Sequence, residues 1–577
     1  MDKRIPIAVQ GYLQEGVDTS KNEGNALRVL LIYPPRAYAR MPYLAPYLLK
    51  GHIEKNSQHK VEICDLNLDY HYLIWQGRYA LNEEKLNPSQ QSRLSIVKSF
   101  GSHAWAFMRD SINYEAINRS TLGSANDVLV GAEYLEREIS QSLGDSGYPL
   151  PSGSETWTTV IESLTYTPLG EFLDKSEIDL ALDVIGISCA YVEQLGPALY
   201  LARSIKRKGF TGKVVIGGSA FTHILNDALK DRSFWINIDY GIPYEGEVTL
   251  LDLLHGLANK NTKFEKANVA FWRDGVGQFV KNFIEREVAH PIPDFKSLQH
   301  KFPTPLPVFP VLTSKGCYWG KCAFCTHHEG YGQGFSKAPN ERIKATIEHI
   351  SSLGGRHFYF VDEALPASKI KYLAELFTEL ERNGTLASPA WMAECRVEKY
   401  STSPDFLAIL ANSGCKLAIS GMETGSQSLM ERMKKGVELE HAREFARQCK
   451  KFGIHTAWMF FIGFPGETLL QMKETFDLIL SCMDDLDYAT VGTFGLERDS
   501  PIWNDPSQYG ISEILGSNEP YRLIFDYIDG EGVTHYRKDV KETLTVFLKH
   551  YPELMPKFLG IIERSCGVFY ESTLERQ

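Results

Sequence analysis

The chain has 577 residues, 43% of them hydrophobic, which is enough for two to four domains with substantial cores. Its formal net charge of −11 argues against a broad nucleic-acid-binding surface. The amino terminus lacks the apolar core of a signal peptide, and no apolar run approaches the roughly 20 residues of a membrane helix. We therefore expect a soluble, cytosolic protein with no nucleic-acid or membrane partner.

The amino-terminal part of the chain has the pattern of a doubly wound α/β domain. Residues 1–25 are polar, and we expect a loose tail there. Over residues 26–260, five strands are predicted, at Leu27–Tyr33, Lys60–Cys64, Asp183–Ser188, Lys213–Ile216 and Asp239–Pro243. Helical segments run through Leu48–Ile53 and over Leu195–Lys208 and Val248–Leu257. Alternating strands and helices predict a parallel, Rossmann-like sheet.

Residues 66–180 interrupt this alternation between the second and third strands. They are rich in aromatic residues and contain two long helical stretches, Leu94–Met108 and Asn126–Ser142. An insertion of this length is uncommon as plain loop, so we expect a mainly helical subdomain. It could be a lid over a site or a structural buttress, and the pattern fits both. Residues 261–304 are expected to be a linker.

A second alternation of strands and helices covers residues 305–500. Six strands are predicted, at Val308–Leu312, His357–Val361, Ala390–Cys395, Lys416–Gly421, Thr456–Ile462 and Tyr488–Phe494. Helices are predicted between them, at Asn340–Leu353, Ile370–Arg382, Asp405–Asn412, His441–Phe452 and Leu469–Cys482. Six such units predict a partial (β/α)6 barrel, with its chemistry at the carboxyl ends of the strands. For residues 501–577 we expect a small helical or mixed cap.

Three of the ten cysteines fall within nine residues, directly after the first strand of this second unit. They are Cys317, Cys322 and Cys325, in the stretch Ser314–Cys325, which we call the cysteine loop. The other seven are scattered singly, at Cys64, Cys189, Cys395, Cys415, Cys449, Cys482 and Cys566. Single cysteines in a reducing cytosol are usually small buried apolar residues, so no auxiliary cluster is expected.

Two kinds of metal chemistry fit the cysteine loop. Three thiolates can bind three irons of a [4Fe–4S] cluster and leave the fourth iron open to a small molecule. The alternative is a structural zinc site with His327 or His328 as the fourth ligand. Gly316 and Gly320 would let the backbone turn around a cluster. Three aromatic side chains of the loop could exclude water or stack on a nucleobase: Tyr318, Trp319 and Phe324.

Polar residues also gather where the later strands of the barrel end. Asp362 and Glu363 follow the second strand, Glu394 and Arg396 the third, Glu423 the fourth and Gly463–Glu467 the fifth. Surface salt bridges are the alternative explanation for such residues. Their placement at strand ends favours an active site instead.

The cysteine loop resembles the cluster loop of the radical S-adenosylmethionine (radical SAM) superfamily. Four later stretches resemble this superfamily too: Phe360–Glu363, Met392–Arg396, Ser420–Ser426 and Phe461–Glu467. Their order and spacing are similar to those of the subgroup with an amino-terminal cobalamin-binding-type domain. The chain departs from the usual C-x-x-x-C-x-x-C pattern, because four residues separate its first two cysteines.

The resemblance implies roles for residues at the strand ends. The three loop cysteines would bind the cluster, and its open iron would chelate the amino and carboxylate groups of SAM. The implied SAM contacts are Phe324 near the adenine, Asp362 and Glu363 at the amine, and Glu394, Arg396 and Glu423 at the ribose or carboxylate. The two glycines that commonly precede the glutamate at the amine position are missing here. An electron from a donor such as flavodoxin or ferredoxin would cleave SAM to methionine and a 5′-deoxyadenosyl radical.

The amino-terminal domain resembles cobalamin-binding domains at three places. Gly186-Ile-Ser188 and Gly217-Gly218 are similar to the Ser-x-Leu and Gly-Gly portions of such domains, and Glu245-Gly-Glu247 to their end. The implied cobalamin contacts are Ser188, Gly217, Gly218, Glu245 and Gly246. Gly-Gly after a strand can also mark only a tight turn. The D-x-H-x-x-G motif that supplies a lower ligand is absent, because the first strand runs into Pro34–Arg40 without a histidine.

Three functional hypotheses follow. The leading one is cobalamin-dependent methylation of an unactivated carbon in a small-molecule natural product or a ribosomally made peptide. The second keeps the radical chemistry without cobalamin and gives rearrangement, epimerisation or cross-linking. The third is a non-catalytic zinc- or corrinoid-binding regulator. The sequence indicates no catalytic acid or base and no oligomeric state.

Overall fold

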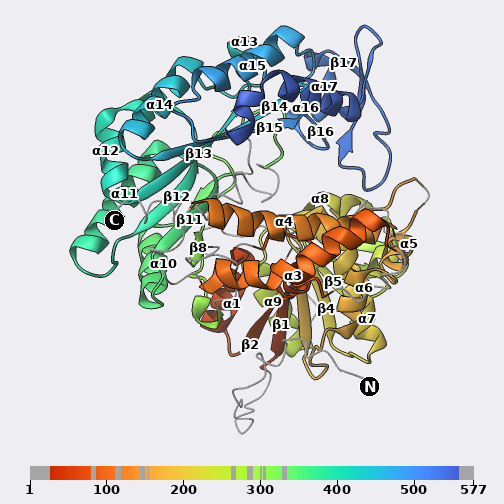
Figure 1. The fold of residues 1–577 in the computed structure, drawn as a ribbon. Helices are drawn as coiled ribbons and strands as arrows, with labels where there is room; N and C mark the ends of the chain where they lie inside the picture. The colour runs from red at the N-terminus through yellow and green to blue at the C-terminus, as the bar shows by residue number, and fades with distance from the viewer. Residues whose placement is uncertain are drawn as a thin grey trace. The chain divides into compact units, whose positions relative to one another are not determined.

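The computed structural model describes residues 26–39, 41–78, 86–110, 119–142, 150–153, 155–260, 268–281, 290–298, 302, 307–327 and 334–557. The chain divides into two compact units, Met1–Pro305 and Leu306–Gln577. Both are seen in Figure 1. The expected tail over 1–25, His328 and Cys566 lie outside the described residues.

The amino-terminal unit is built on a seven-stranded sheet with the order β2-β1-β3-β4-β5-β6-β7. Its first five strands are parallel: β1 (Arg28–Tyr33), β2 (Lys60–Asp65), β3 (Val184–Ser188), β4 (Lys213–Gly217) and β5 (Tyr240–Ile242). Each lies within one residue of its predicted bounds, because each is a short apolar run; β1, β3, β4 and β5 are buried inside the sheet, and β2 is its edge strand. The predicted Rossmann-like fold is confirmed.

An antiparallel hairpin extends this sheet within the stretch that was expected to be linker. It consists of β6 (Val269–Arg273) and β7 (Val276–Val280), with β6 antiparallel to β5. The turn residues Asp274 and Gly275 have φ angles of +54° and +80°. Asp-Gly between two apolar segments is the usual signal of such a turn, so the sequence did contain the information.

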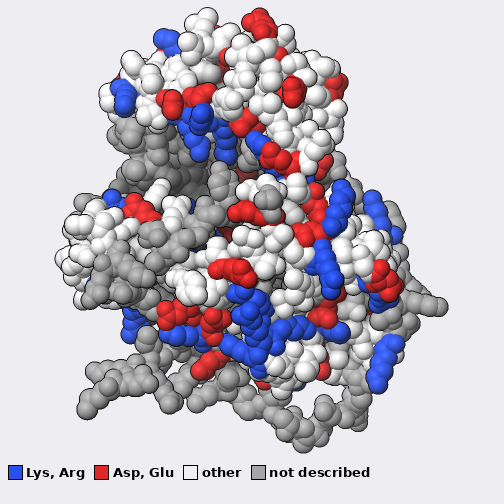
Figure 2. Space-filling view, turned by 90° about the vertical axis from the view of Figure 1, so that its right-hand side faces the viewer, with Lys and Arg blue, Asp and Glu red and all other residues white. Residues whose placement is uncertain are grey.

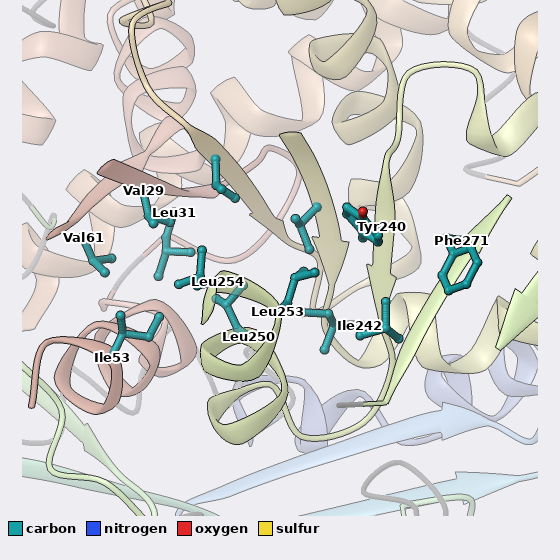
Figure 3. Close-up of a cluster of buried hydrophobic side chains, with 13 residues drawn as sticks. Val29, Leu31, Ile53, Val61, Tyr240, Ile242, Leu250, Leu253, Leu254 and Phe271 are labelled. Carbon is teal, nitrogen blue, oxygen red and sulfur yellow. The ribbon is translucent and has the colours of Figure 1, made fainter. Parts of the chain in front are cut away.

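One face of the sheet is covered by α1 (Leu44–Asn56) and α9 (Glu247–Ala258). Figure 3 shows the cluster of buried side chains between the strands and these two helices, including Val29, Leu31, Ile53 and Leu253. Val29 and Leu31 point to the same face because side chains alternate along a strand. Helix α7 (Leu195–Arg207) connects β3 to β4, and α8 (Ser219–Ala228) connects β4 to β5.

The inserted residues form five helices that pack within their own unit. They are α2 (Leu66–Trp75), α3 (Pro88–Asp110), α4 (Arg119–Ser142), α5 (Trp157–Ser163) and α6 (Pro168–Lys175). The side chains of Tyr70 and Trp75 on α2 donate hydrogen bonds to Glu136 and Glu133 on α4, at 2.7 and 2.8 Å. Arg36, in the loop after β1, pairs with the same Glu136 at 3.2 Å. Such contacts attach the described part of the insertion to the rest of its unit, which both a buttress and a lid require.

The carboxyl-terminal unit contains a fully parallel six-stranded sheet in chain order. Its strands are β8 (Val308–Val311), β11 (His357–Leu365), β12 (Ala390–Cys395), β13 (Cys415–Glu423), β14 (His455–Ile462) and β15 (Tyr488–Thr493). Between them lie α10 (Asn340–Ser352), α11 (Ala367–Arg382), α12 (Pro404–Asn412), α14 (Leu439–Lys451) and α15 (Leu469–Ser481). The predicted partial barrel is confirmed. Strands β11 and β13 are longer than predicted, because their polar ends continue the sheet past a bulge.

Residues beyond β15 are mixed in structure. They include β16 (Leu496–Glu497), α16 (Pro501–Asn504), β17 (Ile511–Ile514), β18 (Ile524–Phe525), β19 (Tyr527–Asp529), β20 (Thr534–His535) and α17 (Arg537–His550). Buried side chains from this segment, among them Ile502 and Phe525, pack in one cluster with Phe464 and with Ala323 of the cysteine loop. The segment therefore helps to support that loop.

Acidic and basic side chains are interspersed on the face seen in Figure 2. Within the described part of the chain, no helix is both long enough and apolar enough to cross a bilayer.

Candidate functional site

The cysteine loop leaves the first barrel strand through the two-residue strand β9 (Ser314–Lys315). All three of its thiols are free and half-buried. Gly316 and Gly320 have positive φ angles of +74° and +58°. A Cβ atom on Gly316 would lie 2.4 Å from the carbonyl oxygen of Gly334, so the loop can take this path only with glycine there.

Asp362 and Glu363 lie at the end of β11 but have different partners. Asp362 is 1% exposed and accepts hydrogen bonds from the backbone N–H and hydroxyl of Thr313 at 3.1 and 3.0 Å and from the hydroxyl of Ser314 at 2.5 Å. Glu363 is more exposed and lies 2.9 Å from Nδ1 of His327. Both were predicted to contact the SAM amine. The structure instead engages Asp362 with the start of the cysteine loop.

Glu394, at the end of β12, is in a more apolar environment than a surface carboxyl. It accepts a hydrogen bond from the hydroxyl of Tyr359 on β11 at 3.2 Å. Burial, together with the nearby carboxylate of Glu363, raises the pKa of Glu394 to about 7. Glu394 and Glu363 are therefore neighbours at the carboxyl edge of the barrel, as their strand-end positions predicted.

Glu423, at the end of β13, forms an ion pair that the sequence did not predict. Its carboxylate lies 2.7 Å from Nζ of Lys435, and both side chains are 13% exposed. Burial lowers the pKa of Lys435, but Glu423 and the Cys322 thiol oppose this effect, so that the pKa lies above its ordinary value. Lys435 is therefore a buried cation beside the cysteine loop. No motif marks it, because it lies in a loop 12 residues after its partner.

Arg396 is almost completely buried behind the cysteine loop. It donates to the backbone carbonyls of Lys435 at 2.5 Å and Gly436 at 3.2 Å, and its guanidinium carbon lies 4.0 Å from the ring centroid of Trp319. Its Nε–H is buried and has no hydrogen-bond partner among the described residues. A buried unpaired donor costs free energy, so an acceptor oxygen on a bound molecule would be stabilising there.

Phe324 and the loop after β14 form an apolar corner beside the cysteines. The ring of Phe324 packs edge-to-face against Phe461, with 5.0 Å between centroids. In the Gly463–Glu467 loop, the Glu467 carboxylate accepts the backbone N–H groups of Gly463 and Phe464. Arg432 donates to the carbonyl oxygens of Pro465 and Gly466 at 2.8 and 3.3 Å. The loop is thus held in one conformation by side chains on both of its sides.

In the amino-terminal unit, the five predicted cobalamin contacts lie at one edge of the sheet. Ser188 ends β3, Gly217 ends β4 and Gly218 follows it, and Glu245 and Gly246 follow β5. In the order β2-β1-β3-β4-β5, the direction of winding changes between β1 and β3, and open α/β sheets bind ligands at the carboxyl ends beside such a point.

The two glycines have a packing reason that needs no ligand. Gly218 has a φ of +99°, and a Cβ there would lie 2.2 Å from the carbonyl oxygen of Cys189. A Cβ on Gly217 would lie 3.1 Å from the carbonyl oxygen of Ile242. Gly218 therefore lets the loop after β4 pass close to the loop after β3, as in the tight turn that was the alternative interpretation, and Gly217 lies close to its paired residue on β5. Next to them, Gln194 donates to the carbonyl of Pro34 at 2.6 Å and joins the loops after β3 and β1.

Comparison with known families assigns the barrel. Residues 311–479 match the family model of the radical SAM superfamily. They form a radical SAM domain. Such a domain uses SAM and a [4Fe–4S] cluster, and the protein is an enzyme.

The chain is also similar to individual proteins and solved structures. The chain is 25% identical to an uncharacterized methyltransferase of Pyrococcus horikoshii, over 57% of this chain and 69% of that protein. The chain also matches two further curated relatives, and it spans only 59% and 61% of the length of these proteins. Among solved structures, the chain is similar to the radical SAM methyltransferase TsrM from Kitasatospora setae, with a TM-score of 0.52, 15% identity and coverage of 83% of this chain and 77% of that one. It is also similar to the cobalamin-dependent radical enzyme OxsB, with a TM-score of 0.56, 14% identity and coverage of 96% and 71%. At these identities the two structural likenesses establish the fold alone.

The donor set of the radical SAM domain is three free, half-buried thiols on one loop, the number that a [4Fe–4S] cluster with one open iron requires. Burial raises the pKa of the Cys322 thiol, and that of Cys325 to about 12. These thiols would therefore stay protonated at neutral pH until metal displaces the protons. A structural zinc site needs four ligands around one ion. No group of three or more His, Cys, Asp or Glu side chains among the described residues could hold a single metal ion, and the predicted alternative ligand His328 lies outside them.

The Gly463–Glu467 loop of the radical SAM domain should make stability depend on pH. Burial raises the pKa of Glu467 to about 7, against an ordinary value of 4.5. Between these two pH values the folded chain holds a proton that the unfolded chain has lost, so this carboxyl lowers stability as pH rises through the window. We expect Glu467→Gln to reduce the loss of unfolding free energy between pH 5 and pH 8 by about 2 kcal/mol.

Urea unfolding of the parent and the variant at each pH measures this difference. The exposed Glu513 provides a control, since Glu513→Gln should leave the pH dependence unchanged. Identical pH profiles for the parent and Glu467→Gln would show that Glu467 ionises normally in the folded chain.

Proposed function

We propose that this enzyme cleaves SAM at a [4Fe–4S] cluster bound by Cys317, Cys322 and Cys325. The observation that carries the proposal is the position of the three free thiols. They lie on one loop at the carboxyl edge of a partial barrel whose sequence matches the radical SAM family model. A bound cluster supplies the electron that cleaves SAM to methionine and a 5′-deoxyadenosyl radical.

The side chains around the cysteine loop supply what a SAM molecule requires. We assign Glu363 to the SAM amine, because it is the partly exposed acid at the end of β11. Phe324 and Phe461 form an apolar wall for the adenine. The unpaired Nε–H of Arg396 is a donor for a ribose or carboxylate oxygen. Glu394 and the Glu423–Lys435 pair complete the polar edge.

We further propose that the amino-terminal unit binds cobalamin and that the overall reaction is methylation of an unactivated carbon in a natural product or peptide. Two facts support this. The fold likeness to two cobalamin-dependent radical enzymes extends over both units of the chain. The residues that resemble cobalamin contacts lie together at the sheet edge where ligands bind. A bound cobalamin supplies the carrier for the methyl group. It would have no histidine ligand from the loop after β1, which contains none.

A second candidate is radical chemistry without cobalamin, ending in rearrangement, epimerisation or cross-linking. It is favoured by the close packing at Gly217 and Gly218, which explains both glycines without a cofactor. The two candidates differ in their products from SAM. Methylation requires S-adenosylhomocysteine and 5′-deoxyadenosine, whereas the second candidate requires 5′-deoxyadenosine alone.

One anaerobic experiment tests these proposals. The protein is reconstituted with iron and sulfide, incubated with hydroxocobalamin, desalted and then given SAM and a reductant such as reduced flavodoxin. We expect a brown protein that retains corrinoid and forms both nucleoside products. A brown protein without corrinoid that forms only 5′-deoxyadenosine would exclude the methylation proposal. A colourless protein that leaves SAM intact would exclude both candidates.

A further inference from the structure

Four consecutive residues bind the cysteine loop from outside it. They are Met433–Gly436, directly after α13 (Gln427–Arg432), and we call them the seat segment. The backbone N–H of Ala323 donates to the carbonyl of Met433, and the indole Nε1–H of Trp319 donates to the carbonyl of Lys434, both at 2.9 Å. The loop is therefore attached to this segment on both sides of Cys322.

The ring of Trp319 lies between two groups that fit it closely. On one side is the guanidinium of Arg396, with its central carbon 4.0 Å from the ring centroid. On another is Gly436, where a Cβ atom would lie 2.4 and 2.5 Å from two ring atoms. Gly436 also has a φ of +66°, and Lys434 one of +55°. The seat segment therefore adopts a costly backbone conformation that leaves room for the indole.

The same contacts fix Lys435. The guanidinium of Arg396 holds its backbone carbonyl, and the Glu423 carboxylate holds its ammonium. The buried cation therefore belongs to the segment that binds the cysteine loop on both sides of Cys322. A nearby positive charge favours the thiolate and the more negative, reduced state of a cluster.

We propose that Trp319 is a positioning residue that anchors the cysteine loop to the seat segment, and that this anchor fixes the segment that bears Lys435 against the part of the loop that carries Cys322. Trp319 lies between the first two cysteines, where this chain has four residues in place of the usual three. The longer spacing is then not a defect of the loop. It accommodates a side chain that fastens the loop to the barrel. The inference rests on the proposed cluster, because the anchor acts through the cluster ligands.

The test compares three variants with the parent after anaerobic reconstitution. Trp319→Ala removes both the ring and its hydrogen bond, and Trp319→Phe keeps a ring but removes the hydrogen bond. Trp391→Phe is the matched control, because Trp391 also donates an indole hydrogen bond to a backbone carbonyl, that of Ser413 at 3.2 Å, but on β12 away from the loop. The readouts are the rate of iron loss to a chelator and the midpoint potential of the cluster.

We expect Trp319→Ala to lose iron at least about fivefold faster than the parent and to have a more negative potential. Trp319→Phe should fall between them, and Trp391→Phe should match the parent. Equal iron loss and equal potential in Trp319→Ala and the parent would overturn the inference. Faster loss in Trp391→Phe as well would also overturn it, since the effect would then be one of general stability.

Two further measurements apply if Trp319→Ala does not fold or if the parent binds no cluster. If Trp319→Ala does not fold, Arg396→Lys loosens the same contact while it retains the charge, and the same changes are expected. If the parent binds no cluster, the proposed function fails, and the anchor is tested on the metal-free protein. Alkylation of Cys322 by iodoacetamide should then be several-fold faster in Trp319→Ala than in the parent, and equal rates would refute the anchor.

Discussion

Replacing Cys322 with alanine should remove the iron–sulfur cluster and, with it, all cleavage of SAM. A [4Fe–4S] cluster with one open iron depends on three protein thiolates, and the loss of one leaves two irons without a protein ligand. The iron content after anaerobic reconstitution should fall from about four per chain to below about one. Formation of 5′-deoxyadenosine, measured by chromatography, should become undetectable.

A second cysteine provides the matched control for this experiment. Cys415 is also a free cysteine, but it is buried at the start of β13 and outside the cysteine loop. Cys415→Ala should cost only about 1 kcal/mol of packing and should leave the iron content unchanged. Retained cleavage in Cys322→Ala would show that the assigned ligands are wrong. Loss of iron in Cys415→Ala would show that the assay reports damage to the fold instead of loss of a ligand.

The sequence predicted the strands of both sheets well because their signal is local. A buried central strand must be a short apolar run, and Ala390–Cys395 has the same bounds in the prediction and in the structure. The cysteine loop was predictable for a similar reason, since its three ligands lie within nine residues. A metal site whose ligands all lie in one short segment can be predicted from that segment alone.

The contacts around the loop could not be predicted in the same way. Lys435 lies in the loop after α13, and its side chain pairs with Glu423. The position of this loop depends on its contact with Trp319. The glycines Gly217 and Gly218 have the same appearance in the sequence whether they approach a cofactor or another loop. A Cβ atom at either position would meet neighbouring backbone atoms, which gives both glycines a packing role whether or not a cofactor binds beside them.

Asp362 shows how a small error in a strand boundary changes an assigned role. The predicted strand ended at Val361, so Asp362 and Glu363 were both placed in a loop that faces SAM. The structure continues β11 to Leu365, and neighbouring side chains of a strand point to opposite faces. Only one of the two acids can then face the barrel interior. Asp362 instead binds the segment that leads into the cysteine loop.

Replacing Asp362 with alanine should therefore destabilise the carboxyl-terminal unit and loosen the cysteine loop. The variant leaves the backbone N–H and hydroxyl of Thr313 and the hydroxyl of Ser314 without their buried acceptor. Each unpaired buried donor costs about 1 kcal/mol or more, so the expected loss is about 3 kcal/mol. Urea unfolding measures the loss, and hydrogen–deuterium exchange of residues 311–327 should show faster exchange at Thr313.

Two further variants show whether the acceptor itself is responsible. Asp362→Asn can keep the one oxygen that accepts both hydroxyl groups and loses the second oxygen that faces the Thr313 backbone N–H, so its loss should lie between those of the parent and Asp362→Ala. Asp477→Ala removes a half-exposed aspartate of α15 that pairs with Lys473 and accepts a hydrogen bond from the Tyr551 hydroxyl, and it should cost less stability than Asp362→Ala. If Asp362→Ala is as stable as the parent, and exchange at Thr313 is unchanged, then other contacts hold the loop. The seat segment should then be tested next, because it binds the same cysteine loop through contacts that do not involve Asp362. A double variant of Asp362 and Trp319 would then lose more iron than the sum of the single variants, since each contact would be replacing the other.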